Sequence, residues 1–266
     1  MKKIFLLLLI SLQLIAGMIK SPLLTYDEES AVATIKVKTV DLGMSGFIVH
    51  KIATNHSSIL KSIVVIGFDK ESETATLKLS EYVGLRNNAL PTGNWKVKVG
   101  DTAILAFGYT RALLIAPTEE IYYRISKSVK IQWLHPDIFA TILSFQGHPT
   151  PLKEDFDIMS NASSVGLIFV YLENRVYTLD AKSFAILSIS DAPLPQKDVV
   201  LPFYTRVHNI DAAWWGEGSD PLEEYAPHYY KLLVEYNRHN RKLYEIVEKS
   251  EKNIQDLLRD FEIGEN

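Results

Sequence analysis

The sequence of 266 residues contains no cysteine. Without disulfide bonds the folded chain must depend on packing alone, which excludes the class of small secreted proteins that are held together by disulfides. Hydrophobic residues make up 47% of the chain, which is enough to form well-packed hydrophobic cores. The length favours two modest domains over a single large one.

A surplus of basic residues is also missing. The chain has 28 lysines and arginines against 32 aspartates and glutamates, and its formal net charge is −4. Without the first seventeen residues, which include Lys2 and Lys3, the formal charge is near −6. Phosphate binding needs a basic excess, so nucleic acid is excluded as the expected partner.

Hydrophobic runs long enough to cross a membrane are absent. The longest N-terminal run, Ile4–Leu12, resumes at Leu14, but a bilayer core of about 30 Å needs about 20 residues. Lys2 and Lys3 precede this run and the small pair Ala16 and Gly17 follows it, which indicates a cleaved signal peptide over residues 1–17. No cysteine follows for a lipid anchor. We therefore expect an exported protein of the periplasm or cell surface of a Gram-negative bacterium, with no membrane span after signal removal.

Residues 18–110 show short alternating apolar segments separated by turns, the pattern of a small antiparallel β domain. A closed barrel of five or six strands would leave no unpaired edge. The expected strands are Thr34–Val40, Phe47–Ile52, Ile59–Phe68, Thr74–Leu79 and Thr102–Phe107.

Residues 111–221 are predicted to form an α/β layer domain. The apolar run Ala112–Ala116 is typical of a buried strand that Pro117 stops, and Thr118–Glu120 has the composition of a helix start. The further expected elements are a strand at Ile131–Leu134, helices at Pro136–Leu143 and Pro151–Met159, a hairpin of Val165–Leu172 with Val176–Leu179, and a strand at Phe184–Ile189.

The last part of this domain, residues 191–221, combines four prolines with four large aromatic residues, Phe203, Tyr204, Trp214 and Trp215. This composition predicts little regular structure. Because so many rings are unusual in a free linker, we expect the segment to wrap and pack against a domain.

Residues 222–266 carry the clearest periodicity, with steps of three and four residues. Such a seam predicts a long amphipathic helix that either pairs in a coiled coil or folds back on its own domain. A helix of about 35 residues would extend about 50 Å, more than a small domain covers. Asn240 and Ser250 interrupt the apolar seam but could fix its register. The other seam residues are Leu233, Tyr236, Leu243, Val247, Ile254, Leu257 and Phe261. The predicted fold class is thus α+β: a barrel-like β domain, an α/β layer domain and a long C-terminal helix.

No catalytic, cofactor or metal site is predicted. His50 and His56 lie six residues apart with no acidic residue or cysteine between them, which matches no standard zinc motif. The turn Gly43–Gly46 lacks the spacing of a nucleophile elbow, so Ser45 has no activating partner. The sequence His135-Pro136-Asp137 is interpreted as a helix start, at which Asp137 accepts main-chain N–H bonds as a cap. An enzyme therefore ranks last among the possible functions.

Several short sequence motifs, taken together with their order and spacing, resemble the N-terminal domain of the plasminogen-binding protein A family of Gram-negative spiral bacteria. The likeness spans residues 20–235. The motifs are Gly43-Met44-Ser45-Gly46 with Val49-His50, His56-Ser57-Ser58-Ile59, Val99-Gly100-Asp101, Arg111 to Pro117, His135 to Ala140, Ser164-Val165-Gly166-Leu167, and Pro202 to Val207 with Asn209-Ile210-Asp211.

The resemblance implies an envelope protein that captures host plasminogen through kringle modules, which bind lysine side chains. The chain ends Gly264–Asn266 and not in a lysine, so an internal site is the alternative. Glu245 with Lys249, and Glu248 with Lys252, are each four residues apart in the favourable acid-first order on a helix. We expect these four residues to contact the partner, although glutamate–lysine pairs of this spacing are also common on the exposed faces of ordinary helices.

Two functions remain. The first is a non-enzymatic binding protein that contacts plasminogen at the cell surface. The second is a periplasmic structural or scaffold protein that assembles through its C-terminal helix, either with itself or with an envelope partner.

Overall fold

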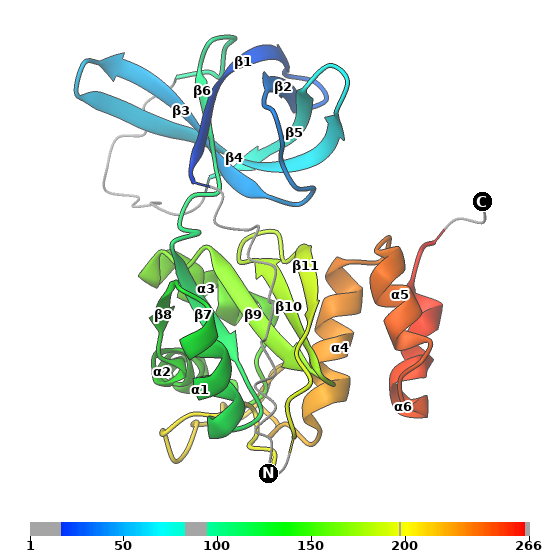
Figure 1. The fold of residues 1–266 in the computed structure, drawn as a ribbon. Coiled ribbons are helices and arrows are strands. Elements are labelled where there is room, and N and C mark those ends of the chain that lie inside the picture. Colours follow the sequence, from blue (N-terminus) through cyan, green and yellow to red (C-terminus); the bar gives the residue numbers. More distant parts are fainter. Residues whose placement is uncertain (1–16, 83–94, 197, 264–266) are drawn as a thin grey trace. The chain divides into compact units, whose positions relative to one another are not determined.

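The computed structural model describes residues 17–82, 95–196 and 198–263, which form two compact units, residues 16–109 and a second unit that begins at Thr110 (Figure 1). Apart from Gly17, the predicted signal peptide lies outside the described residues. Within the described ranges, no helix is both long and apolar enough to span a bilayer.

The first unit is a closed antiparallel barrel with strand order β1-β2-β5-β4-β3-β6, as the alternating pattern predicted. Its strands are β1 (Ile19–Asp27), β2 (Val32–Lys36), β3 (Ser45–Ala53), β4 (His56–Asp69), β5 (Thr74–Glu81) and β6 (Thr102–Leu105). Inward residues of every strand fill the barrel, among them Leu23, Ile35, Ile48 and Ile63. At Gly46 a Cβ atom would lie 2.0 Å from the Ile104 carbonyl oxygen, so only glycine allows β3 and β6 to approach so closely.

Strand β1 is absent from the predicted strands, yet it closes the barrel by pairing with both β2 and β6. Its side chains break the usual alternation: Ser21 is buried, whereas Pro22 and Leu24 are exposed. Because Ser21 faces inward while Pro22 and Leu24 face outward, the alternation of polar and apolar residues that reveals a strand is weak here.

The second unit contains a five-stranded sheet with order β11-β10-β9-β7-β8. Its strands are β7 (Arg111–Ile115), β8 (Gln132–Leu134), β9 (Leu167–Leu172), β10 (Arg175–Asp180) and β11 (Ile186–Asp191). Strand β7 is parallel to β8 and β9, and the other pairs are antiparallel. The predicted hairpin is confirmed: Glu173 and Asn174 both have positive φ, as a tight hairpin turn requires.

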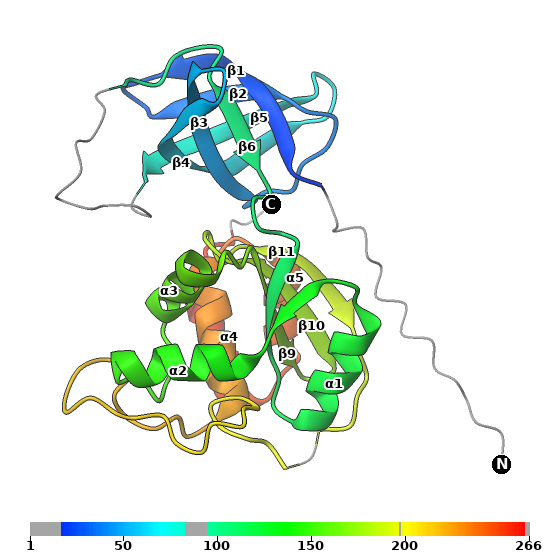
Figure 2. The same ribbon diagram turned by 90° about the vertical axis from the view of Figure 1, so that its left-hand side faces the viewer.

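Helices cover both faces of this sheet. Helix α1 (Glu119–Ser128) lies on one side, and α2 (Pro136–Gln146), α3 (Lys153–Ser163) and α4 (Tyr225–Tyr236) lie on the other (Figure 2). Leu113 and Ile115 of β7 point into the core shared with α2, α3 and α4. Every residue of β9 is buried, because both faces are covered. The α/β layer predicted from the sequence is therefore present.

The single long C-terminal helix is not confirmed, because the segment is divided into short helices. These are α4, α5 (Arg241–Val247), α6 (Lys252–Gln255) and a 3₁₀ turn, η1 (Asp256–Asp260). After α4, the Asn237 side chain donates to the Phe184 carbonyl and accepts from the Ile186 amide, which ties this point of the chain to the start of β11. Asn240 then caps α5 by accepting from the Leu243 amide. Asn237 thus ends one helix, and Asn240 of the seam starts the next.

The seam residues pack into their own unit. Leu233, Leu243, Val247 and Ile254 are at most 2% exposed, while Leu257 and Phe261 are partly buried against the same core. Tyr236 is 41% exposed. Pairing through this seam with a second chain would therefore require most of this packing to open.

Candidate functional site

Residues 198–206, the strap, cross the carboxyl end of β7. Two main-chain hydrogen bonds fix the strap there, from the Val200 amide to the Pro117 carbonyl and from the Tyr204 amide to the Ala116 carbonyl, both 2.8 Å long. Phe203 is fully buried and stacks on Phe139 of α2 with ring centroids 5.5 Å apart. The predicted packing of the aromatic segment is correct for this part.

Asp137, in the first turn of α2, anchors the end of the strap. Its carboxylate accepts hydrogen bonds from the Thr205 hydroxyl (2.8 Å), the Arg206 amide (2.9 Å) and Arg206 Nε (2.7 Å). Burial alone would raise the pKa of Asp137, but these hydrogen bonds outweigh it and lower the pKa to about 2. The cap of α2 is His135, which accepts from the Asp137 amide at 3.3 Å. The prediction that the Asp137 carboxylate caps the helix is therefore wrong, because this carboxylate accepts from Thr205 and Arg206.

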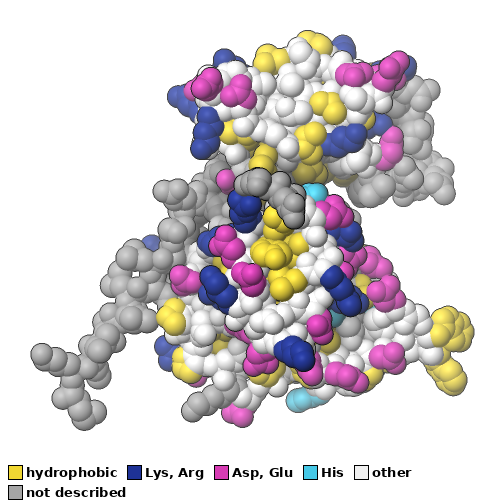
Figure 3. Space-filling model, turned by 90° about the vertical axis from the view of Figure 1, so that its right-hand side faces the viewer, with side chains coloured by type: hydrophobic (Ala, Val, Ile, Leu, Met, Phe, Trp, Pro, Cys, Tyr) yellow, Lys and Arg dark blue, Asp and Glu magenta, His cyan; other side chains and the backbone are white. Residues whose placement is uncertain are grey.

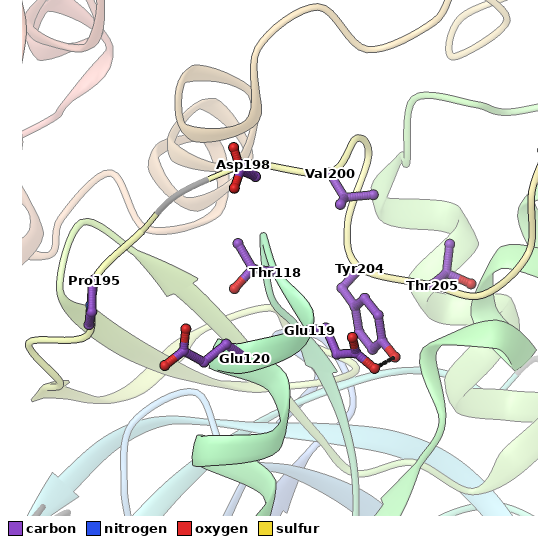
Figure 4. A pocket seen from close by; sticks show the side chains of 8 residues that line it. All are labelled: Thr118, Glu119, Glu120, Pro195, Asp198, Val200, Tyr204 and Thr205. Atoms are coloured by element: carbon purple, nitrogen blue, oxygen red, sulfur yellow. Dashed lines mark hydrogen bonds between the residues drawn. The ribbon is translucent and has the colours of Figure 1, made fainter.

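The strap and the start of α1 enclose a pocket of about 530 Å³. Thr118 caps α1 by accepting from the Ile121 amide, which places the next two glutamates at the pocket wall (Figure 4). The lining residues are Thr118, Glu119, Glu120, Pro195, Asp198, Val200, Tyr204 and Thr205. The pocket therefore lies beyond the carboxyl end of a parallel strand, where α/β sheets commonly bind ligands.

Several polar groups of the pocket already have hydrogen-bond partners. The Tyr204 hydroxyl donates to Glu119 at 3.1 Å (Figure 4). Outside the lining, Arg124 Nε donates to Glu120 at 2.8 Å. Burial and the neighbouring Glu119 carboxylate raise the pKa of Tyr204 well above its usual value, so the phenol stays protonated. Among the described residues that line the pocket, none is a histidine, lysine or cysteine. This pocket was missed from the sequence, where Thr118–Glu120 indicated only a helix start.

The histidines considered for metal binding do not come together. His50 Nδ1 lies 2.7 Å from the buried carboxylate of Asp101, whereas His56 is exposed at the start of β4. Within the described ranges, no group of three or more histidine, aspartate or glutamate side chains is placed to hold a metal ion. The His50 and Asp101 pair therefore links β3 to the turn before β6.

The four residues predicted to contact a partner, Glu245, Glu248, Lys249 and Lys252, are all exposed. Because α5 ends at Val247 and α6 begins at Lys252, the helical spacing that would pair glutamate with lysine is interrupted. Neither lysine ammonium has a hydrogen bond or an ion pair within the described part of the chain.

The turn between α5 and α6 is itself well fixed. The Ser250 hydroxyl donates to Glu173 at 3.1 Å, and the Gln255 amide donates to the carbonyls of Glu248 and Ser250. The turn thus presents two free ammonium groups from a fixed main chain.

Comparison with known proteins gives a consistent result. The family model described as "Plasminogen-binding protein pgbA N-terminal" matches residues 18–233. Two proteins named "Plasminogen-binding protein PgbA", from Helicobacter pylori strains J99 and 26695, are each 29% identical over 73% of this chain. The match covers 42% of each of these relatives, so the chain spans less than half of their length. No solved structure matches the chain.

Proposed function

The chain belongs to the plasminogen-binding protein PgbA N-terminal family, and from this premise we propose that it is an exported, non-enzymatic binding protein that contacts plasminogen. The observation that carries the proposal is the family match over residues 18–233, which includes nearly all of the barrel and the sheet of the second unit. The relatives are named as binding proteins.

Export is the first part of the proposal. The basic pair and apolar run of residues 1–17 have the composition of a signal peptide, and the family match begins at the next residue, Met18. The protein then acts in the periplasm or at the cell surface of a Gram-negative bacterium. Protease treatment of intact cells distinguishes these two locations, and an uncleaved precursor retained in the cytosol would contradict export.

The proposed contact is made by Lys249 and Lys252, whose free ammonium groups suit the lysine-binding modules that the family resemblance implies. Both lysines lie beyond residue 233, outside the part of the chain that matches the family model. The contact through this turn is therefore a property of this chain and can be tested separately from family membership.

The experiment measures binding of the full chain to immobilised plasminogen, with and without a free lysine analogue. We expect saturable binding that the analogue displaces and that Lys249→Ala with Lys252→Ala weakens about tenfold, which corresponds to about 1.4 kcal/mol. Lys70→Ala with Lys130→Ala is the matched control, because it removes two exposed lysines elsewhere. Absence of binding by the wild type would contradict the function. An equal loss of affinity in both double variants would contradict the assignment of the contact to Lys249 and Lys252.

The scaffold function has less support. Four of the seam residues that would mediate assembly are buried in their own unit, so assembly would need a different surface. Sedimentation of the full chain tests this alternative. A concentration-independent monomer disfavours a self-assembling scaffold, and a stable oligomer that Tyr236→Ala disrupts would favour it.

A further inference from the structure

Two adjacent tryptophans on the second unit are almost fully exposed. Trp214 is 96% exposed and Trp215 is 83% exposed, within the segment 210–220 that we term the tryptophan loop. Tryptophan is usually highly buried, because its large apolar surface favours removal from water. An apolar projection of this kind is visible at the edge of the unit (Figure 3). The prediction that both rings pack against a domain is therefore wrong.

The tryptophan loop is nevertheless held firmly by its main chain. On its first side, the Asp211 amide donates to the Ser144 hydroxyl and the Ala213 amide donates to the Gly147 carbonyl, both at 2.9 Å. On its second side, the Thr150 amide donates to the Gly218 carbonyl at 3.1 Å, and the Thr150 hydroxyl donates to the Asp220 carbonyl at 2.7 Å. The loop thus lies beside the end of α2, where the chain after Thr205 extends past that helix (Figure 2).

Two glycines make this close packing possible. A Cβ atom at Gly147 would lie 2.6 Å from the main-chain nitrogen of Ala213, and one at Gly218 would lie 2.9 Å from the Thr150 carbonyl oxygen. Both glycines also have positive φ, which other residues rarely adopt. The two rings are therefore presented from a fixed frame, which lowers the entropic cost of binding a partner.

The charged residues that flank the rings along the chain are acidic. From Val207 to Tyr230 the chain contains no lysine or arginine and has five acidic residues. Three of these, Asp211, Glu217 and Asp220, lie in the tryptophan loop and are exposed. Such a surface repels anionic lipids and nucleic acid, and it attracts cationic groups.

The two features fit one kind of ligand. A lysine or arginine side chain binds favourably over the face of a tryptophan ring, and its apolar stem also covers ring surface. Nearby carboxylates add attraction to the same cation. We propose that the tryptophan loop is a docking surface for a partner protein that presents lysine or arginine side chains. This surface is independent of the plasminogen contact at Lys249 and Lys252.

The test measures binding of the full chain to immobilised peptides of alternating lysine and glycine. Matched peptides with serine or glutamate in place of lysine are the specificity controls. We expect binding to the lysine peptide alone, weakening as salt rises. Trp214→Ala with Trp215→Ala should weaken it about tenfold. Trp95→Ala, which removes a 45% exposed tryptophan from the barrel unit, should leave it unchanged.

The contribution of charge is measured separately with Asp211→Asn and Glu217→Gln, which together should weaken binding about threefold. Circular dichroism checks that each variant stays folded, as expected for exposed side chains. Binding that survives loss of both tryptophans, or equal binding to the serine peptide, would overturn the proposal. So would tryptophan-dependent binding to phosphatidylcholine vesicles or to a chitin oligosaccharide without binding to the lysine peptide.

Discussion

The strap and the tryptophan loop are neighbours in sequence and each contains two adjacent aromatic residues, but they bury these residues very differently. Phe203 is fully buried and Tyr204 is 8% exposed, whereas Trp214 and Trp215 project into solvent. Both segments are fixed by main-chain hydrogen bonds. The strap crosses the end of β7, where Phe203 joins the core, while the loop lies beside the end of α2 and contacts the core through Ile210 at its start. Position relative to the sheet, more than aromatic content, therefore decides which rings are buried.

The largest expected effect compares one ring from each segment. Phe203→Ala should lower the free energy of unfolding by about 3–5 kcal/mol, because it leaves a cavity between α2 and the strap. Trp214→Ala should change it by no more than about 0.5 kcal/mol, since that ring is solvated. Urea unfolding of both variants measures the difference. Similar losses in the two variants would contradict the comparison.

The next effect concerns the chain beside Thr150, which supports the tryptophan loop. His228 Nε2 lies 2.9 Å from the Pro151 carbonyl oxygen and donates to it, while burial lowers the pKa of His228 to about 4. Between pH 6.5 and pH 4 the unfolded chain binds a proton that the folded chain does not. Stability should therefore fall by up to about 3 kcal/mol as the pH drops through this window.

The control for this titration is His228→Gln, which has no titrating ring. Chemical denaturation at several pH values should show a flatter pH dependence for this variant between pH 6.5 and pH 4. The same slope in both proteins would show that His228 is not the group responsible.

The anchor of the strap gives a smaller effect in a lower pH range. The pKa of Asp137 is lowered to about 2 in the folded chain, from an ordinary value of 3.8. The stability that its hydrogen bonds supply is complete above about pH 4 and is lost as the pH falls toward 2, by about 2 kcal/mol. Asp137→Asn should lose a similar amount at neutral pH. Thermal unfolding checks this, and an unchanged midpoint would contradict the anchoring role.

The smallest effect tests the frame of the tryptophan loop. Gly147→Ala and Gly100→Ala both place a side chain at a positive φ, but only Gly147 has the Ala213 main chain in the way. The first variant should therefore be less stable than the second by about 1 kcal/mol. Equal stability of the two variants would mean that the tryptophan loop moves away from position 147 without loss of stability.

Much of the architecture follows from local patterns in the sequence. The strand β7, the starts of α1 and α2 and the turn at Glu173 and Asn174 are all encoded by neighbouring residues, so they could be predicted. Strand β1 could not, because buried Ser21 and exposed Pro22 and Leu24 obscure its alternation of polar and apolar residues. The prediction of one continuous helix after Leu222 was wrong for another reason. The Asn237 side chain forms hydrogen bonds with the main chain of Phe184 and Ile186, at the start of β11, and helical periodicity cannot reveal such a contact.

The candidate sites were less predictable than the fold. Lys249 and Lys252 are exposed as expected, although the helix that was to pair them with glutamates is broken. The pocket beside α1 depends on the strap, which lies about 80 residues later in the chain. The exposure of Trp214 and Trp215 depends on the contacts that hold their loop beside the end of α2. Contacts distant in sequence decide both features.

The two exposed surfaces can be separated in one titration against immobilised plasminogen. It compares the wild-type full chain with the Lys249→Ala and Lys252→Ala double variant and with the Trp214→Ala and Trp215→Ala double variant. The account predicts that the wild type and the tryptophan variant bind equally and that the lysine variant binds about tenfold more weakly. Equal binding by the lysine variant and the wild type would contradict it.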